Sequence, residues 1–229
     1  MVSRKANSSS PGSDAGEDTG RGRRDKKRVK PPLTETALRD LALHYAARFA
    51  TTGARLESYL ARKLKERGVA EDGAEDGGGR TGQIDIPALI ARLVELGYVD
   101  DDAYAQARAR DLVARGYGGR RVEQVLWAAG VDEGLRQAHA PGESASRKAA
   151  ALMAQKKRLG PWSTLSGLGR EVSSDPLARR KAHEKAVAAM LRAGHQYDHV
   201  RFILAASREE DVDQWLDEAA DEEGIEGSW

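Results

Sequence analysis

A series of glycines divides the middle of this chain into short helices, and their spacing limits the possible folds more than any other feature of the sequence. Gly97 follows an apolar run, where a helix ends in a residue that can take a left-handed backbone conformation. The aspartates at 100–102 then supply acceptors and negative charge for the free amides of a new helix. Gly116 interrupts the chain again, and residues 119–129 carry apolar side chains at helical spacing. Residues 96–131 therefore predict three helices joined by very short turns.

The same break recurs at Gly68, Gly130 and Gly194, which lie 62 and 64 residues apart. Apolar residues stand eight and four positions before each glycine, so each is expected to close an amphipathic helix. Together with the helices on either side, these breaks predict an all-α fold of three tandem three-helix repeats. Units of this size bury little apolar surface alone but share a core when stacked, so we expect an elongated, curved helical body.

Changes in composition mark the expected segment boundaries. We predict a disordered basic N-terminal tail over 1–33, a first repeat over 34–97 with a flexible insertion at 70–83, a second repeat over 98–141, a third repeat over 142–206 with a linker at 159–175, and an acidic C-terminal helix and tail over 207–229.

The net charge of +1 conceals an uneven distribution along the chain. Residues 1–30 hold nine Lys or Arg and four Asp or Glu, whereas residues 207–229 hold one Arg and ten Asp or Glu. The part between them is mildly basic. A basic body with a basic arm favours nucleic acid, or a complex that contains it, as partner. The alternative is that the charged ends only keep the protein in solution.

Cysteine is absent, which excludes disulfides and thiolate metal sites and is typical of a protein from a reducing compartment. The chain contains no apolar run of the length that a membrane span requires, and its polar, basic beginning does not resemble a secretory signal. We therefore expect a cytoplasmic protein with no membrane contact.

Motifs for catalysis or metal binding are weak. His195 and His199 have the spacing of a metal pair on a helix, but no third ligand accompanies them, and we interpret them as ordinary exposed helix histidines. The glycine-rich piece at 77–82 lacks the Gly-Lys-Ser/Thr ending of a phosphate loop. No serine-nucleophile or zinc-protease motif occurs. We therefore expect no enzyme activity, no metal and no cofactor.

Two stretches resemble a known family. Residues 96–105, LGYVDDDAYA, are similar to the LGYLDDERFA segment of the RecX family of bacterial recombinase regulators, and residues 115–122 with Gly130 and Val131 resemble its RGYGPRRI and GV segments. Gly119 stands where the family pattern has proline, and residues 70–83 look like an insertion. The similarity is dense over 85–135 and looser over 34–68 and 143–206.

The resemblance implies a non-enzymatic regulator of DNA recombination, DNA repair and the SOS response. Such a protein binds RecA filaments on DNA, lies along the filament groove, and usually restrains filament extension, ATP hydrolysis and strand exchange. It implies a monomer that reaches DNA directly or through the filament. The alternative that the residues leave open is a RecA-independent DNA-binding protein with helix-turn-helix-like units, because the helix expected at 119–129 begins with polar and charged side chains.

Cations at the joints between helices are the candidate contact residues, because arginine forks suit both phosphates and acidic protein faces. The predicted contact set is Arg115, Tyr117, Arg120, Arg121, Lys156, Lys157 and Arg158. The alternative for each cation is that it only stabilises the end of a helix. Tyr98, Tyr104 and Tyr117 are expected to pack rather than to stack on bases. Trp127 lies one position off the apolar stripe, and the sequence leaves open whether it covers a repeat interface or meets a partner.

Overall fold

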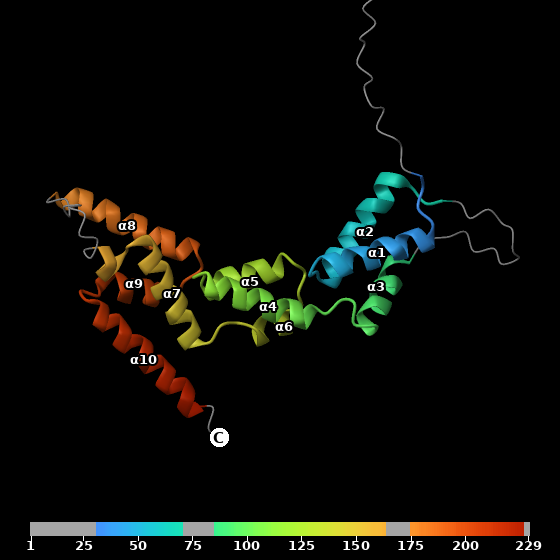
Figure 1. The fold of residues 1–229 in the computed structure, drawn as a ribbon. Coiled ribbons are helices and arrows are strands. Elements are labelled where there is room, and N and C mark those ends of the chain that lie inside the picture. Colours follow the sequence, from blue (N-terminus) through green and yellow to red (C-terminus); the bar gives the residue numbers. More distant parts are fainter. Residues whose placement is uncertain (1–30, 71–84, 164–174, 227–229) are drawn as a thin grey trace, which may run out of the picture. The chain divides into compact units, whose positions relative to one another are not determined.

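The computed structural model describes residues 31–70, 85–163 and 175–226, and Figure 1 shows that these residues form helices joined by short connections. The elements are α1 (Glu35–Arg48), α2 (Gly53–Arg67), α3 (Ile86–Glu95), α4 (Asp101–Ala114), α5 (Gly119–Trp127), α6 (Glu133–Ala138), α7 (Glu143–Lys157), the 3-10 helix η1 (Gly160–Ser163), α8 (Pro176–Arg192), α9 (Tyr197–Ala205) and α10 (Glu209–Glu226). The all-α prediction is confirmed for the described residues. Most of the tail, the insertion at 71–83 and positions 164–174 of the linker lie outside them.

Side-chain oxygens at the predicted caps start several helices. The Asp100 carboxylate accepts the Ala103 N–H at 2.8 Å before α4, and the Asp85 carboxylate accepts the Ala88 N–H at 2.9 Å before α3. Each such cap stabilises a helix by roughly 1 kcal/mol, because it satisfies an amide that has no partner within the helix. The sequence places these starts correctly because capping is a local effect.

Buried apolar residues form three clusters, each drawn from one continuous part of the chain. The clusters lie within residues 33–99, 105–131 and 150–215. A fully buried side chain such as Leu60, Leu126 or Ile203 contributes roughly 2 kcal/mol to its cluster. The arrangement as three equivalent repeats stays a prediction.

Two segments are more ordered than the sequence indicated. Leu33, which we placed at the end of the tail, is fully buried, and its backbone pairs with Gly68 and Ala70 beside α2. In the predicted linker, residues 160–163 form η1, and Pro161 is buried. In both cases apolar side chains beside a turn pack onto the nearby core instead of remaining in water.

The acidic helix α10 packs on α7 and contributes to the third cluster. Val212 and Trp215 are buried there. The Arg147 side chain donates to the Trp215 carbonyl oxygen at 2.8 Å and lies over the indole ring, with 4.8 Å from its Cζ to the ring centroid. The Glu223 carboxylate accepts the Ser144 N–H at 2.9 Å, so α10 supplies a cap that α7 lacks in its own sequence.

The first joint connects residues 52–55 to residues 101–104 and 129–130. The Thr52 hydroxyl donates to the Ala129 carbonyl oxygen, and the Gly53 N–H donates to the Asp101 carboxylate at 2.8 Å. The Arg55 guanidinium donates to the Tyr104 hydroxyl at 2.6 Å. Side chains therefore supply at least one partner in each of these hydrogen bonds.

The second joint connects residues 116–121 to residues 193–195. The Gly118 N–H donates to the Ala193 carbonyl at 2.9 Å, and the Arg120 N–H donates to the Gly194 carbonyl at 3.2 Å. Gly194 has a φ of +93°, and a Cβ there would collide with the backbone nitrogen of Arg121. Only glycine permits both this conformation and this approach.

Candidate nucleoprotein-binding surface

Four cations surround a hollow of 510 Å³ where the C-terminal ends of α4, α7 and α8 come together. We call it the cationic hollow, and its lining consists of Arg115, Gly116, Tyr117, Met153, Lys156, Lys157, Ala189, Arg192 and Ala193. Three helices end here, and the negative ends of their dipoles favour nearby cations. The local fold therefore concentrates positive charge at this place.

The backbone at Gly116 brings α4 against α7. A Cβ at Gly116 would lie 3.3 Å from the backbone nitrogen of Met153, so a larger residue would push the two helices apart. The close approach lets the Lys156 ammonium group donate to the Arg115 carbonyl oxygen at 3.4 Å. Gly116 thus holds together two of the predicted contact residues.

Part of the positive charge of the hollow has no internal partner. Arg115 forms an ion pair with Asp111 at 3.3 Å, but both side chains are largely exposed, and such pairs contribute little. Lys157 and Arg192 are exposed and form no hydrogen bond or ion pair with any residue that the structure describes. These two side chains are free to bind oxygen atoms of a phosphate or a carboxylate.

Tyr117 is half-buried and packs against both the second and the third apolar cluster. Its predicted packing role is therefore confirmed, and its ring forms one wall of the hollow. Tyr104 is also half-buried, beneath the Arg55 side chain. The packing prediction was wrong for Tyr98, whose side chain is 54 % exposed because it follows the Gly97 turn on the outside of α3.

The remaining predicted cations lie outside the hollow. Arg120 and Arg121 stand in the first turn of α5. Gly118, the residue before α5, donates its N–H to the carbonyl oxygen of Ala193, which lines the hollow. The Arg121 guanidinium donates to the Gln124 side chain at 2.6 Å. Arg158 is the residue that ends α7, with a left-handed φ of +54°, and it does not line the hollow.

Arg192 was missed by the sequence analysis. It stands two residues before Gly194, in the last turn of α8, and that position is a signal for a cation that stabilises a helix end. The sequence does not indicate that α8 ends beside α4 and α7, so it could not assign Arg192 to the same surface.

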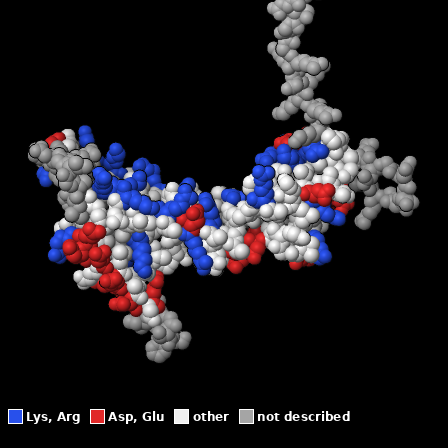
Figure 2. Space-filling view, in the orientation of Figure 1, with Lys and Arg blue, Asp and Glu red and all other residues white. Residues whose placement is uncertain are grey.

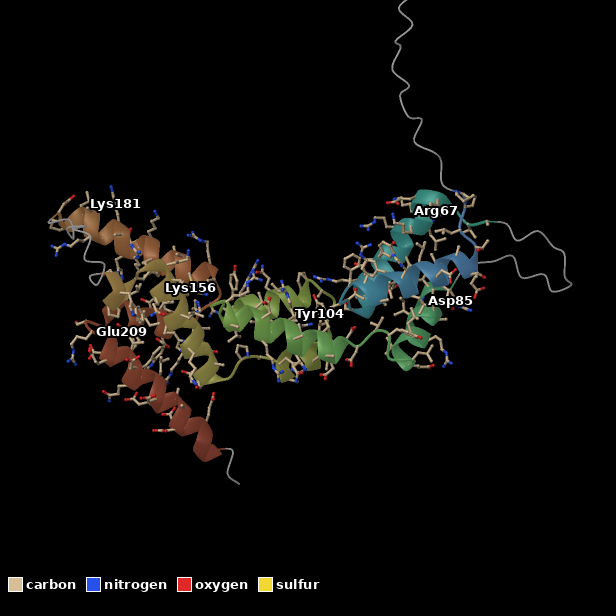
Figure 3. The ribbon with its side chains drawn as sticks, in the orientation of Figure 1. Arg67, Asp85, Tyr104, Lys156, Lys181 and Glu209 are labelled. Atoms are coloured by element: carbon tan, nitrogen blue, oxygen red, sulfur yellow. The ribbon has the colours of Figure 1, made fainter. Side chains whose placement is uncertain are left out.

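Lys and Arg side chains gather beyond the hollow as well. Figure 2 shows them along α8 and α5, and separately over α2, whereas α10 carries acidic side chains. Figure 3 labels Lys156 on α7 and Lys181 on α8, both within the first of these basic areas. A basic area of this kind attracts a phosphate backbone.

The two histidines are buried rather than exposed, which corrects the sequence interpretation. His195 is 1 % exposed, and its Nε2 lies 3.2 Å from the Gly116 carbonyl oxygen, to which it donates in the Nε2–H tautomer. His199 is 5 % exposed and contacts the Glu143 carboxylate at 3.0 Å. Both follow the Gly194 turn into the interior, where they have structural partners. The described residues contain no group of three side chains suited to hold a metal ion.

Their surroundings shift the pKa values of His195 and Glu143. Desolvation lowers the pKa of His195, because the charged imidazolium loses its water. For Glu143, desolvation alone would raise the pKa, but hydrogen bonds from Arg147 and His199 and their positive charges outweigh it, and the pKa is lowered.

In the described part of the chain, none of the helices has both the length and the hydrophobicity to cross a bilayer.

Comparisons with known proteins bear on the whole chain. No protein-family model matches the sequence. A regulatory protein RecX from Myxococcus xanthus (strain DK1622) is 34 % identical over 195 residues, which cover 82 % of this chain and 97 % of that protein. The crystal structure of RecX from Lactobacillus salivarius superposes with a TM-score of 0.53 at 18 % identity, covering 80 % of this chain and 96 % of that one. The structural match is evidence for the fold.

Proposed function

The chain belongs to the RecX family of regulatory proteins, and from this premise we propose that it binds RecA filaments on DNA and restrains their extension, their ATP hydrolysis and strand exchange. We propose that it acts by binding, without catalysing a reaction, as a cytoplasmic monomer. The observation that carries the proposal is the 34 % identity to a RecX protein over 82 % of this chain and 97 % of that protein.

The cationic hollow supports a nucleoprotein partner. It presents Lys157 and Arg192 without internal partners, next to Arg115 and Lys156. Polyanions bind to such surfaces with salt-dependent affinity, because each neutralised phosphate releases counterions. We assign the contact with the filament to this hollow and to Arg120 and Arg121 at the neighbouring start of α5.

The test is a titration of RecA's DNA-dependent ATP hydrolysis with substoichiometric amounts of the full-length protein. We expect the hydrolysis rate to fall, because blocking filament extension removes active RecA from the DNA. No change at any ratio would contradict the proposal. A second titration without residues 1–30 measures what the basic arm adds, and this truncation keeps the buried Leu33 in place.

Charge-reversed variants test the site separately from the function. Lys157→Glu with Arg192→Glu should raise the concentration needed for half-maximal inhibition roughly tenfold, about 1.4 kcal/mol, because two free cations become repulsive. Arg120→Glu with Arg121→Glu should also weaken inhibition. The matched control is Arg39→Glu with Arg92→Glu, two exposed arginines on α1 and α3. Equal effects of the control and of the hollow variants would refute the site assignment.

A second candidate is DNA binding without RecA through helix-turn-helix-like units. The exposed arginines and Gln124 at the start of α5 favour it, since such residues read bases in known recognition helices. It predicts tight binding to duplex DNA alone, with an affinity that falls steeply as salt is added. Weak duplex binding together with inhibition of RecA would exclude this candidate.

A further inference from the structure

Trp127 ends α5 with its indole on the outside of the molecule. The side chain is 67 % exposed, the largest exposed fraction among the large apolar side chains of the described residues. The structure therefore decides the question that the sequence left open, because Trp127 covers no interface within the described chain. An indole in water is a large flat surface available to a partner.

The face of α5 that carries Trp127 is positively charged. Arg120, Gln124 and Trp127 are spaced at i, i+4 and i+7, so they share one side of the helix, with about 10.5 Å along the axis from the first to the last. The one acidic side chain of α5, Glu123, is paired with Arg136 at 2.7 Å. Arg120 forms no side-chain hydrogen bond with any residue that the structure describes. The face thus offers a free cation and a free aromatic ring to a phosphate-bearing ligand.

The polar side chains of this face are poorly arranged to read duplex DNA. The Arg121 guanidinium donates to the side-chain Oε1 of Gln124 at 2.6 Å, and the Glu123 carboxylate accepts from Arg136. Side chains that hydrogen-bond to one another must first break those bonds before they can bind to the base edges of a duplex. An exposed indole can stack on a base only where that base is unpaired, because a duplex covers the faces of its bases with its own stacking.

We propose that this face of α5 binds single-stranded DNA, with Trp127 stacked on an unpaired base and Arg120 bound to a phosphate of the same strand. The inference rests on the proposed function, since it names the kind of DNA strand that the regulator contacts. Charge complementarity and the free ring favour a nucleic acid over an apolar protein surface, which would leave Arg120 without a counter-charge.

The experiment is a titration of the full-length protein, without RecA, with a short oligothymidylate and with a duplex of the same length. The chain has four tryptophans, so the variant Trp127→Phe identifies which one responds. We expect the strand to quench the fluorescence of the natural protein and to quench that of Trp127→Phe much less. The matched control is Trp162→Phe, at a half-buried ring, which should keep the quenching. Equal quenching of the natural protein and of Trp127→Phe would overturn the proposal.

The binding affinity for the oligothymidylate provides a second test. Trp127→Ala should weaken binding to the oligothymidylate roughly 5- to 150-fold, the range for one base–aromatic stack, and should change duplex binding little. Since the indole is mostly exposed, the free energy of unfolding of this variant should stay close to that of the natural protein. Unchanged affinity for the single strand, or an equal loss for strand and duplex, would overturn the proposal.

Parallel RecA titrations separate this inference from the proposed function. If Trp127→Ala loses its effect on RecA hydrolysis but keeps its affinity for the single strand, Trp127 contacts protein, and the inference is wrong while the proposed function stands. If the natural protein leaves RecA unaffected but shows quenching through Trp127, the proposed function is wrong and the inference stands.

Discussion

The first joint and the second joint share one arrangement but differ in the atoms that hold it. In both, the first turn of a helix (α2 or α5) lies against a glycine turn, at Gly130 or at Gly194. Side chains hold the first joint, through Thr52, Asp101 and Arg55, whereas backbone groups of residues 118 and 120 hold much of the second. The first joint should therefore respond to side-chain changes in small steps, and the second should respond mainly to changes at Gly118, Gly194 and His195.

Gly194→Ala is expected to have the largest effect. The added methyl group meets the backbone of Arg121, which cannot rotate away, and the residue must keep a left-handed φ of +93°. We expect a loss of about 2–5 kcal/mol in the free energy of unfolding, measured in urea. The control is Gly68→Ala, which has a φ of +77° and a ψ of 167° but open space around it, and should lose about 1–3 kcal/mol from backbone strain alone. Equal losses would mean that the close approach at Gly194 contributes nothing.

Gly130→Ala should cost less than Gly194→Ala, because the added methyl group closely meets one atom, the Cβ of Ala54, rather than three atoms of Arg121. We expect a loss of about 2–3 kcal/mol by the same measurement. Ala54→Gly in the same chain removes the obstructing methyl group, so the double variant should recover part of the loss in a double-mutant cycle. Strict additivity of the two substitutions would contradict the difference between the joints.

Thr52→Ala removes two hydrogen bonds from the first joint. Its hydroxyl donates to the Ala129 carbonyl oxygen and accepts the Arg55 N–H that begins α2. We expect a loss of about 1.5–2.5 kcal/mol in thermal or urea unfolding. Thr34→Ala removes only a cap, the acceptor of the Ala37 N–H before α1, and should lose about 1 kcal/mol. A result in which Thr34→Ala costs as much would show that the Thr52–Ala129 bond is not stabilising.

Acidification should weaken the second joint by a smaller amount. Burial lowers the pKa of His195 from the ordinary 6.5, so below that pH the unfolded chain binds a proton that the folded chain resists. Stability therefore falls as the pH drops below about 6.5, with a slope of at most about 1.4 kcal/mol per pH unit.

Urea unfolding at several pH values measures this slope. His195→Gln keeps a donor for the Gly116 carbonyl oxygen and should flatten the slope, whereas His44→Gln, at an exposed position, should not. Glu143 affects stability over a different pH range. Its pKa is lowered in the folded protein, so its protonation reduces the free energy of unfolding only as the pH falls below 4.5. A slope that persists in His195→Gln would assign it to another group.

The sequence predicts the helices of this fold well because their boundaries depend on local chemistry. Asp100 and Gly97 mark a start and a stop through their own side chain or lack of one, and both act where expected. Contacts between distant segments have no such local signal. The Thr52–Ala129 bond joins residues 77 positions apart, and nothing around Thr52 identifies its partner.

The candidate surface also combines residues that local sequence signals predict with residues that only the packing of distant segments brings together. Arg115, Tyr117, Lys156 and Lys157 were predicted one by one from their places at helix ends, and the structure brings them to one hollow. Arg192 completes the hollow only through the packing of α8 near α4 and α7. The burial of His195 and His199 follows from where the chain turns after Gly194, and their i, i+4 spacing alone gives no indication of depth.

The backbone contacts of the second joint have a consequence for how this protein can evolve. Amide and carbonyl groups are present whatever side chain a position carries, so substitutions other than proline at residues 120 and 193 leave these bonds available, whereas a Cβ at Gly118 would collide with the backbone of Gly194 and His195. Mutations can therefore accumulate in the last third of the chain without detaching it, provided that Gly118 and Gly194 are kept.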